Sequence, residues 1–147
     1  MISHVLKTSL ISLGVGFLTE IINGWLSTQF LSKFFEANLI TILVALLAIN
    51  AATMGIVLTK IRDLIDKSGG AEFFKKSRAQ MLLAVNEQVG LIVFATVLLT
   101  IKSGAPISAI TNLPFLLNSI VTAVFVYALI ILYDTAKSVL IIVDYEG

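Results

Sequence analysis

Apolar residues dominate this chain in four stretches, each long enough to cross a membrane. A helix needs about 20 mostly apolar residues to span the hydrocarbon core, which is roughly 30 Å thick. The four stretches cover residues 8–30, 37–59, 79–101 and 115–133. The charged residues inside them are Glu20 and Glu87 alone, so the pattern predicts four transmembrane helices.

Charged residues gather between the second and third stretches, in the loop 60–78 (KIRDLIDKSGGAEFFKKSR), which holds nine of the nineteen. Eight of the ten Lys and Arg residues lie in this loop or in the two terminal tails, and the opposite side has Lys33 and Lys102. Basic residues favour the cytoplasmic side. We therefore expect an all-α membrane protein, and we expect its location to be the bacterial cytoplasmic (inner) membrane. It is a single domain over residues 1–147, with two antiparallel hairpins and both termini, including the tail 134–147, in the cytoplasm.

The second helix is predicted to continue past the membrane as a short cytoplasmic extension. Apolar residues keep the helical period as far as Ile65, and Ser68-Gly69-Gly70 is a natural stop, with a new helix near Ala71. The tail after Tyr133 is either a further helical extension or a short β-prone segment. Apolar residues of these parts are candidates for docking a cytosolic partner: Ile61, Leu64, Ile65, Phe73, Phe74, Val139, Ile141 and Val143.

The first helix carries a stripe of polar and small residues. Their spacings of 3, 4, 4, 3 and 4 place them on one face. Such a stripe does not face lipid, because polar groups there lack hydrogen-bond partners. It is either a packing seam against other helices or the lining of a pore or oligomer axis. The residues are Ser9, Ser12, Gly16, Glu20, Asn23 and Ser27.

The second helix has a stripe of small residues, which predicts close helix packing. Its members are Thr41, Ala45, Ala48, Ala52, Gly55 and Thr59.

Two carboxylates lie inside the predicted spans, Glu20 near the midplane and Glu87 nearer one end. A charged residue there costs on the order of 2.5–3.5 kcal/mol. Each is therefore either functional or held by a buried hydrogen bond to Asn50, Asn118 or a backbone carbonyl. The candidate intramembrane polar residues are Asn50, Glu87, Gln88 and Asn118.

Composition narrows the classes of function. The chain is 58% hydrophobic and 13% charged, against roughly 25% charged in soluble domains. A net charge of +1 gives no field for nucleic acid. The chain has no cysteine, and its single histidine, His4, lies in the tail. We expect no enzyme activity, no cofactor and no metal site.

Two functions fit this pattern. The first is a homo-oligomeric, channel-like pore with the polar stripe on a shared axis. The second is a non-conducting anchor or sensor subunit that recruits a cytosolic effector protein. A small cation-coupled transporter is weaker, because the prolines lie in a loop and do not break a span. In architecture alone, the chain resembles small multi-span membrane proteins of bacterial anti-phage operons, more than it resembles a phage holin. The expected partners are membrane lipid, further copies of the chain and a cytosolic protein.

Overall fold

Four helices make up the part of the chain that the computed structural model describes, residues 2–68, 71–104 and 112–143. Side chains are described there except at 2, 3, 64, 67, 68, 71–77 and 141–143. The helices are α1 (Ile2–Trp25), α2 (Phe30–Ser68), α3 (Ala71–Lys102) and α4 (Leu113–Val143). All four are long and apolar enough to cross a membrane, which confirms the predicted all-helical design.

The helix ends agree with several sequence signals. α2 continues to Ser68 and α3 starts at Ala71, as the apolar period and the Gly-Gly stop predict. α4 continues to Val143, so the tail takes the helical alternative up to that residue. α4 also begins earlier than predicted, with Pro114 in its first turn, where the missing N–H of proline costs no helical hydrogen bond.

The break between the first two helices lies earlier than predicted, at residues 26–29 instead of 31–36. Ser27 has a φ of 51°, and its N–H donates to the Gly24 carbonyl while the Thr28 N–H donates to the Asn23 carbonyl. This pair of bonds is the Schellman motif, which ends a helix at a residue of left-handed conformation. Ser27 therefore lies outside α1, and the prediction that it belongs to the stripe of the first helix is wrong.

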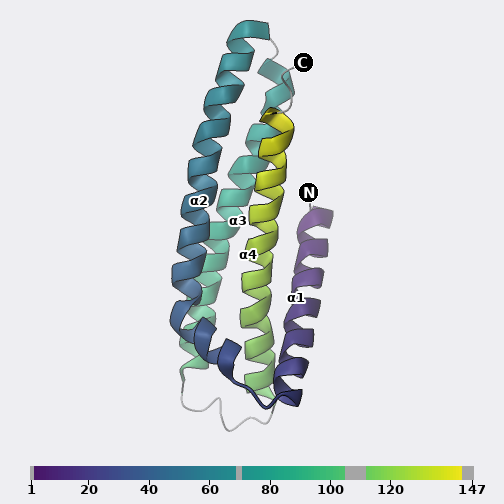
Figure 1. Cartoon of the computed structure of the whole chain (residues 1–147), viewed down its shortest axis with the longest axis vertical. Helices are drawn as coiled ribbons and strands as arrows, with labels where there is room; N and C mark the ends of the chain where they lie inside the picture. The colour runs from purple at the N-terminus through teal and green to yellow at the C-terminus, as the bar shows by residue number, and fades with distance from the viewer. Residues whose placement is uncertain (1, 69–70, 105–111, 144–147) are drawn as a thin grey trace.

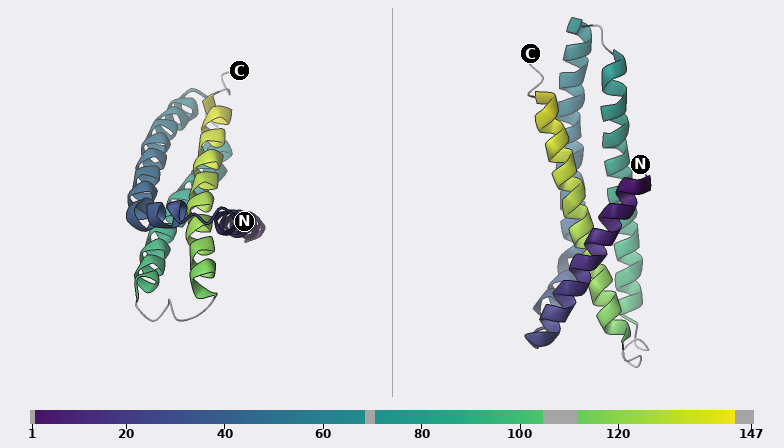
Figure 2. Two further views of the ribbon diagram at one scale, coloured as in Figure 1. Left: turned by 60° about the horizontal axis from the view of Figure 1, so that its bottom comes forward. Right: turned by 90° about the vertical axis from the view of Figure 1, so that its right-hand side faces the viewer.

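The helices form an elongated bundle in which α1 packs against α4, on the side away from α2 (Figure 1). The chain therefore has to cross α4 to reach α2, and Ser32 and Phe35 contact Asn118 and Phe125 of α4 on the way. The first turns of α2 make this passage as a helical elbow that lies across the bundle before α2 turns along it (Figure 2). The elbow brings the start of α2 close to α3 and α4 at one end of the bundle.

The core lies between α2, α3 and α4. Leu39 and Leu43 of α2 are 0% and 1% exposed, and they belong to one buried cluster with Ala95 of α3 and Val121 of α4. The small-residue stripe of α2 turns away from this core. Within the subunit, the prediction that this stripe packs closely is wrong. The leucines of α2 bury more apolar area than its alanines would. Its exposed members are Thr41, Ala45, Ala48, Ala52, Gly55 and Thr59.

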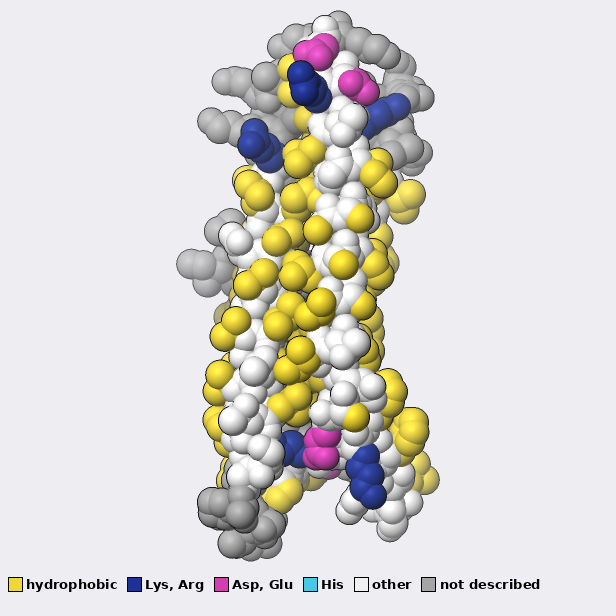
Figure 3. Space-filling model, turned by 90° about the vertical axis from the view of Figure 1, so that its left-hand side faces the viewer, with side chains coloured by type: hydrophobic (Ala, Val, Ile, Leu, Met, Phe, Trp, Pro, Cys, Tyr) yellow, Lys and Arg dark blue, Asp and Glu magenta, His cyan; other side chains and the backbone are white. Residues whose placement is uncertain are grey.

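Three helices extend beyond α1 at one end. His4, near the start of α1, lies level with Asp134 of α4, because their side chains are 3.4 Å apart. We call the parts beyond this level, residues 59–68, 71–79 and 135–143, the stalk. α3 has 32 residues, roughly 48 Å, which exceeds a 30 Å hydrocarbon core by about 18 Å. On the face in Figure 3, charged side chains lie near both ends of the bundle, with an uncharged band between them.

Candidate functional site

α1 and α4 approach most closely at Gly16. A Cβ built on Gly16 would lie 2.2 Å from the Ser119 carbonyl oxygen and 3.1 Å from the Ala123 nitrogen. Ser119 and Ala123 are four residues apart on α4, and small residues at this spacing let two membrane helices pack backbone to backbone. This pair on α4 is not among the predicted packing residues, although its small-xxx-small spacing is visible in the sequence.

The polar stripe of α1 is mainly a packing seam within the subunit. Ser12 is 1% exposed and Asn23 is 8% exposed, and Gly16 lies against α4. Ser9 is half-buried and lines a cavity between α1, α3 and α4. In this arrangement α4 occupies the face that a pore around α1 would need.

Glu20 belongs to a hydrogen-bonded network. Asn118 of α4 donates from Nδ2 to Oε1 of Glu20 at 2.8 Å. Asn23, one turn further along α1, donates from Nδ2 to Oε2 at 3.2 Å. Each carboxylate oxygen therefore accepts an amide hydrogen. The predicted hydrogen bond between Glu20 and Asn118 is present, and it is partly buried.

The network continues through the elbow of α2 to α3. Ser32 donates to Oδ1 of Asn118 at 3.1 Å, and Nζ of Lys102 donates to the Ser32 hydroxyl at 2.9 Å. Lys102 also pairs with Glu36 at 2.7 Å, and the Lys102 side chain is only 11% exposed. We call the connected set Glu20, Asn23, Ser32, Glu36, Lys102 and Asn118 the carboxylate network.

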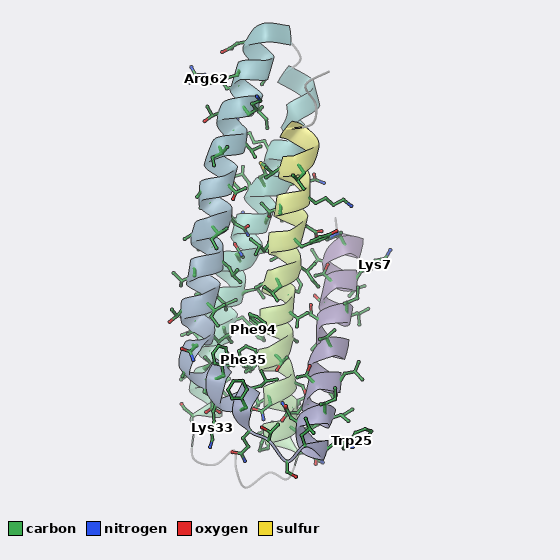
Figure 4. All side chains as sticks on the ribbon, viewed as in Figure 1. Lys7, Trp25, Lys33, Phe35, Arg62 and Phe94 are labelled. Carbon is green, nitrogen blue, oxygen red and sulfur yellow. The ribbon has the colours of Figure 1, made fainter. Side chains whose placement is uncertain are left out.

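The carboxylate network joins all four helices at the end of the bundle that also carries Trp25 and Lys33 (Figure 4). It contains two carboxylates and one ammonium group, linked by amides and a hydroxyl that both donate and accept. Such a chain fixes the relative positions of the helices. The sequence pattern does not point to Ser32, Glu36 or Lys102 as site residues, because all three lie outside the four predicted spans.

The second intramembrane carboxylate has a different partner from those predicted. Tyr127 of α4 lies with its hydroxyl 3.5 Å from Oε2 of Glu87, a distance at the outer limit of hydrogen bonding. Glu87 also lines two cavities between α1, α3 and α4. It is therefore held more loosely than Glu20, and beside space that a ligand could enter.

Asn50 of α2 and Gln88 of α3 are each 1% exposed, and their amide groups have no hydrogen-bond partner among the described residues. Val57 of α2 and Met81 of α3 share a buried cluster. Asn50 and Gln88 each lie seven residues, or two helical turns, from this cluster. Because α2 and α3 are antiparallel, both displacements run in the same direction along the bundle. The two buried amides therefore lie at about the same level on α2 and α3.

Three of the predicted docking residues have described side chains, and all three pack within the stalk. Ile61 is 5% exposed and forms a cluster with Val57 and Met81, against which Ile65 and Val139 also pack. Their docking role stays a prediction. The side chains of the other members lie outside the described set: Leu64, Phe73, Phe74, Ile141 and Val143.

Comparison of the chain with protein-family models, with curated proteins and with solved structures gives no match.

Proposed function

We propose that the chain is a non-conducting membrane anchor or sensor subunit that holds a cytosolic protein partner at the membrane. The observation that carries this proposal is the stalk, which continues three helices beyond the start of α1. Within it, Ile61 and Ile65 of α2 and Val139 of α4 belong to one apolar cluster, so these two helices support each other there. A surface that is already folded binds a partner without the entropic cost of ordering.

The stalk lies on the cytoplasmic side in this proposal. Six of the chain's ten Lys and Arg residues are in the loop 60–78 at this end, and basic loops are retained in the cytoplasm. The membrane is the bacterial cytoplasmic membrane. The genetic context in this proposal is an anti-phage operon, the setting of the small membrane proteins that the chain resembles in architecture. In such an operon the membrane subunit works with a cytosolic effector.

Charge reversal at the two ends of α2 tests the docking role. Arg62 lies on the stalk and Lys33 at the opposite end, and both are exposed (Figure 4). Arg62→Glu should weaken recovery of a cross-linked cytosolic partner severalfold, because a charge at the rim of an interface steers association. Lys33→Glu is the matched control and should leave recovery unchanged. Equal recovery with both variants would remove the stalk from the docking proposal.

Orientation is checked separately with single cysteines, because the chain has none of its own. Asp66→Cys on the stalk and Lys33→Cys at the opposite end are treated in intact cells with a membrane-impermeant maleimide. Labelling of residue 33 alone is expected. Labelling of residue 66 in intact cells would reverse the proposed topology and place the stalk outside the cytoplasm.

A homo-oligomeric pore is the second candidate. The observation in its favour is that polar side chains lie on both sides of the Gly16 contact, with Ser9 and Ser12 on one side and the carboxylate network on the other. Separation of α1 from α4 at Gly16 would join them into one polar path. Copies would meet at the small-residue face of α2, which permits close approach.

Ion flux through liposomes that contain the purified protein separates the two candidates. The anchor proposal expects no flux above that of empty liposomes. Flux whose ion selectivity changes with Glu20→Gln would favour the pore, because a carboxylate that lines the path favours cations. Flux that Glu20→Gln leaves unchanged would reject a pore lined by Glu20.

A further inference from the structure

A groove runs between α1 and α3, with α4 beside both. α1 crosses α4 obliquely (Figure 2), so the two helices diverge on either side of their contact at Gly16. Two cavities lie along the N-terminal half of α1, with volumes of about 450 and 540 Å³, and Glu87 lines both. Each volume falls in the range of roughly 300–1,000 Å³ that is typical of small-molecule sites.

The cavity of about 450 Å³ is apolar and lies within the membrane-spanning segments of three helices. Leu13, Leu91, Phe94 and Val124 contribute to its lining. We call it the apolar cavity. In a membrane, the molecules that meet such a surface are acyl chains, and water is not stabilised by hydrocarbon walls. An acyl chain is therefore the occupant whose chemistry the apolar cavity fits.

The second cavity opens at the level where α1 begins and carries charges of both signs. His4, Asp134 and Lys137 line it, together with Gln80, and Nε2 of His4 lies 3.4 Å from Oδ2 of Asp134. We call it the polar cavity. Lysine binds phosphate groups as a point charge, and basic groups between membrane helices bind lipid headgroups.

We propose that the groove binds a glycerophospholipid of the surrounding membrane. One acyl chain lies in the apolar cavity, and the phosphate group lies in the polar cavity against Lys137 and His4. The order of the two cavities along α1 matches the order of chain and headgroup in a membrane leaflet. Lys137 belongs to the stalk, but the surface around Arg62 that the anchor proposal tests does not line either cavity, so the two proposals are tested by different residues.

Two glycines provide a matched test. A Cβ added at Gly90 or at Gly14 would meet nothing within 4 Å, but Gly90 lines the apolar cavity and Gly14 does not. Gly90→Leu should place its side chain in the cavity, because its Cβ has open space, and Gly14→Leu should change only the outer surface of α1. The full-length proteins are reconstituted in vesicles of phosphatidylethanolamine and phosphatidylglycerol, extracted in detergent and examined by native mass spectrometry.

The wild-type protein and Gly14→Leu should each retain one phospholipid, and Gly90→Leu should lose it. Lys137→Gln, a change of an exposed side chain that leaves the cavity intact, should lower retention about two- to fivefold, as expected for a partly exposed ion pair. This second variant tests the proposal even if Gly90→Leu fails to fold.

Three results would overturn the lipid site. The first is phospholipid retention by folded Gly90→Leu or by Lys137→Gln at the wild-type level. The second is the absence of bound phospholipid from the wild-type protein. The third is a dimer mass that Gly90→Leu abolishes, which would assign the groove to a second copy of the chain.

Discussion

The contact at Gly16 gives a quantitative prediction for the pairing of α1 with α4. A Cβ at Gly16 would lie 2.2 Å from the Ser119 carbonyl oxygen, which is 0.8 Å short of the 3.0 Å that real Cβ contacts respect. The obstacle is backbone, so α1 has to move away from α4. A gap of 0.5–1 Å forfeits roughly a quarter to a half of each contact's dispersion energy. Overpacking of this kind costs about 1–3 kcal/mol, and a backbone clash belongs at the upper end.

Gly16→Ala also gains helix propensity of about 1 kcal/mol, so the net loss in the free energy of unfolding should be about 2 kcal/mol. Gly14→Ala is the control, because its Cβ meets nothing within 4 Å, and it should be neutral or stabilising by up to about 1 kcal/mol. Unfolding in mixed micelles by increasing dodecyl sulfate, followed by circular dichroism, measures both. If Gly16→Ala is as stable as Gly14→Ala, the close crossing is wrong.

Three further substitutions test the network and the turn. Asn118→Leu removes hydrogen bonds to α1 and α2 and should lower the free energy of unfolding by about 1–2 kcal/mol. Asn38→Leu is the control and should cost less, because the Asn38 amide donates only to a carbonyl of its own helix. Equal losses of unfolding free energy in the two variants would contradict the network. Lys102→Met leaves Glu36 without its ion pair and should lower the free energy of unfolding, and adding Glu36→Leu should recover most of that loss. If the losses of the two single variants add in this double-mutant cycle, the two residues are not coupled. Ser27→Gly should raise the melting temperature by relieving the left-handed conformation, and an unchanged or lower melting temperature would contradict that geometry.

The small-residue face of α2 shows why pattern alone misassigns some packing. Alanine, threonine and glycine at helical spacing predict a close contact, but the pattern does not say with which helix. The structure turns Leu39 and Leu43 to the core instead. A helix has room for one main buried face in a three-helix core, and the larger side chains fill that space with more contact.

For the polar stripe of α1, in contrast, the sequence pattern correctly indicates a buried face. The sequence shows that Ser12, Gly16 and Asn23 share a face that avoids lipid, and the structure agrees that Ser12 and Asn23 are buried. The sequence leaves open whether that face meets another helix or an axis between copies. The choice depends on whether α4 offers small residues at the same level, and this level is set by loop lengths and crossing angle.

The sequence by itself determined the four apolar helices, the Gly-Gly stop after α2 and the start of α3. Those features depend on local composition and hydrophobic period, because a bilayer requires every spanning segment to satisfy its own backbone. Only the tertiary structure decided that α1 pairs with α4, that Glu20 meets Asn118, and that Lys102 reaches Ser32 and Glu36. These contacts join residues 66 to 98 positions apart, and no local pattern records which distant side chains the crossing of two helices brings within hydrogen-bonding distance.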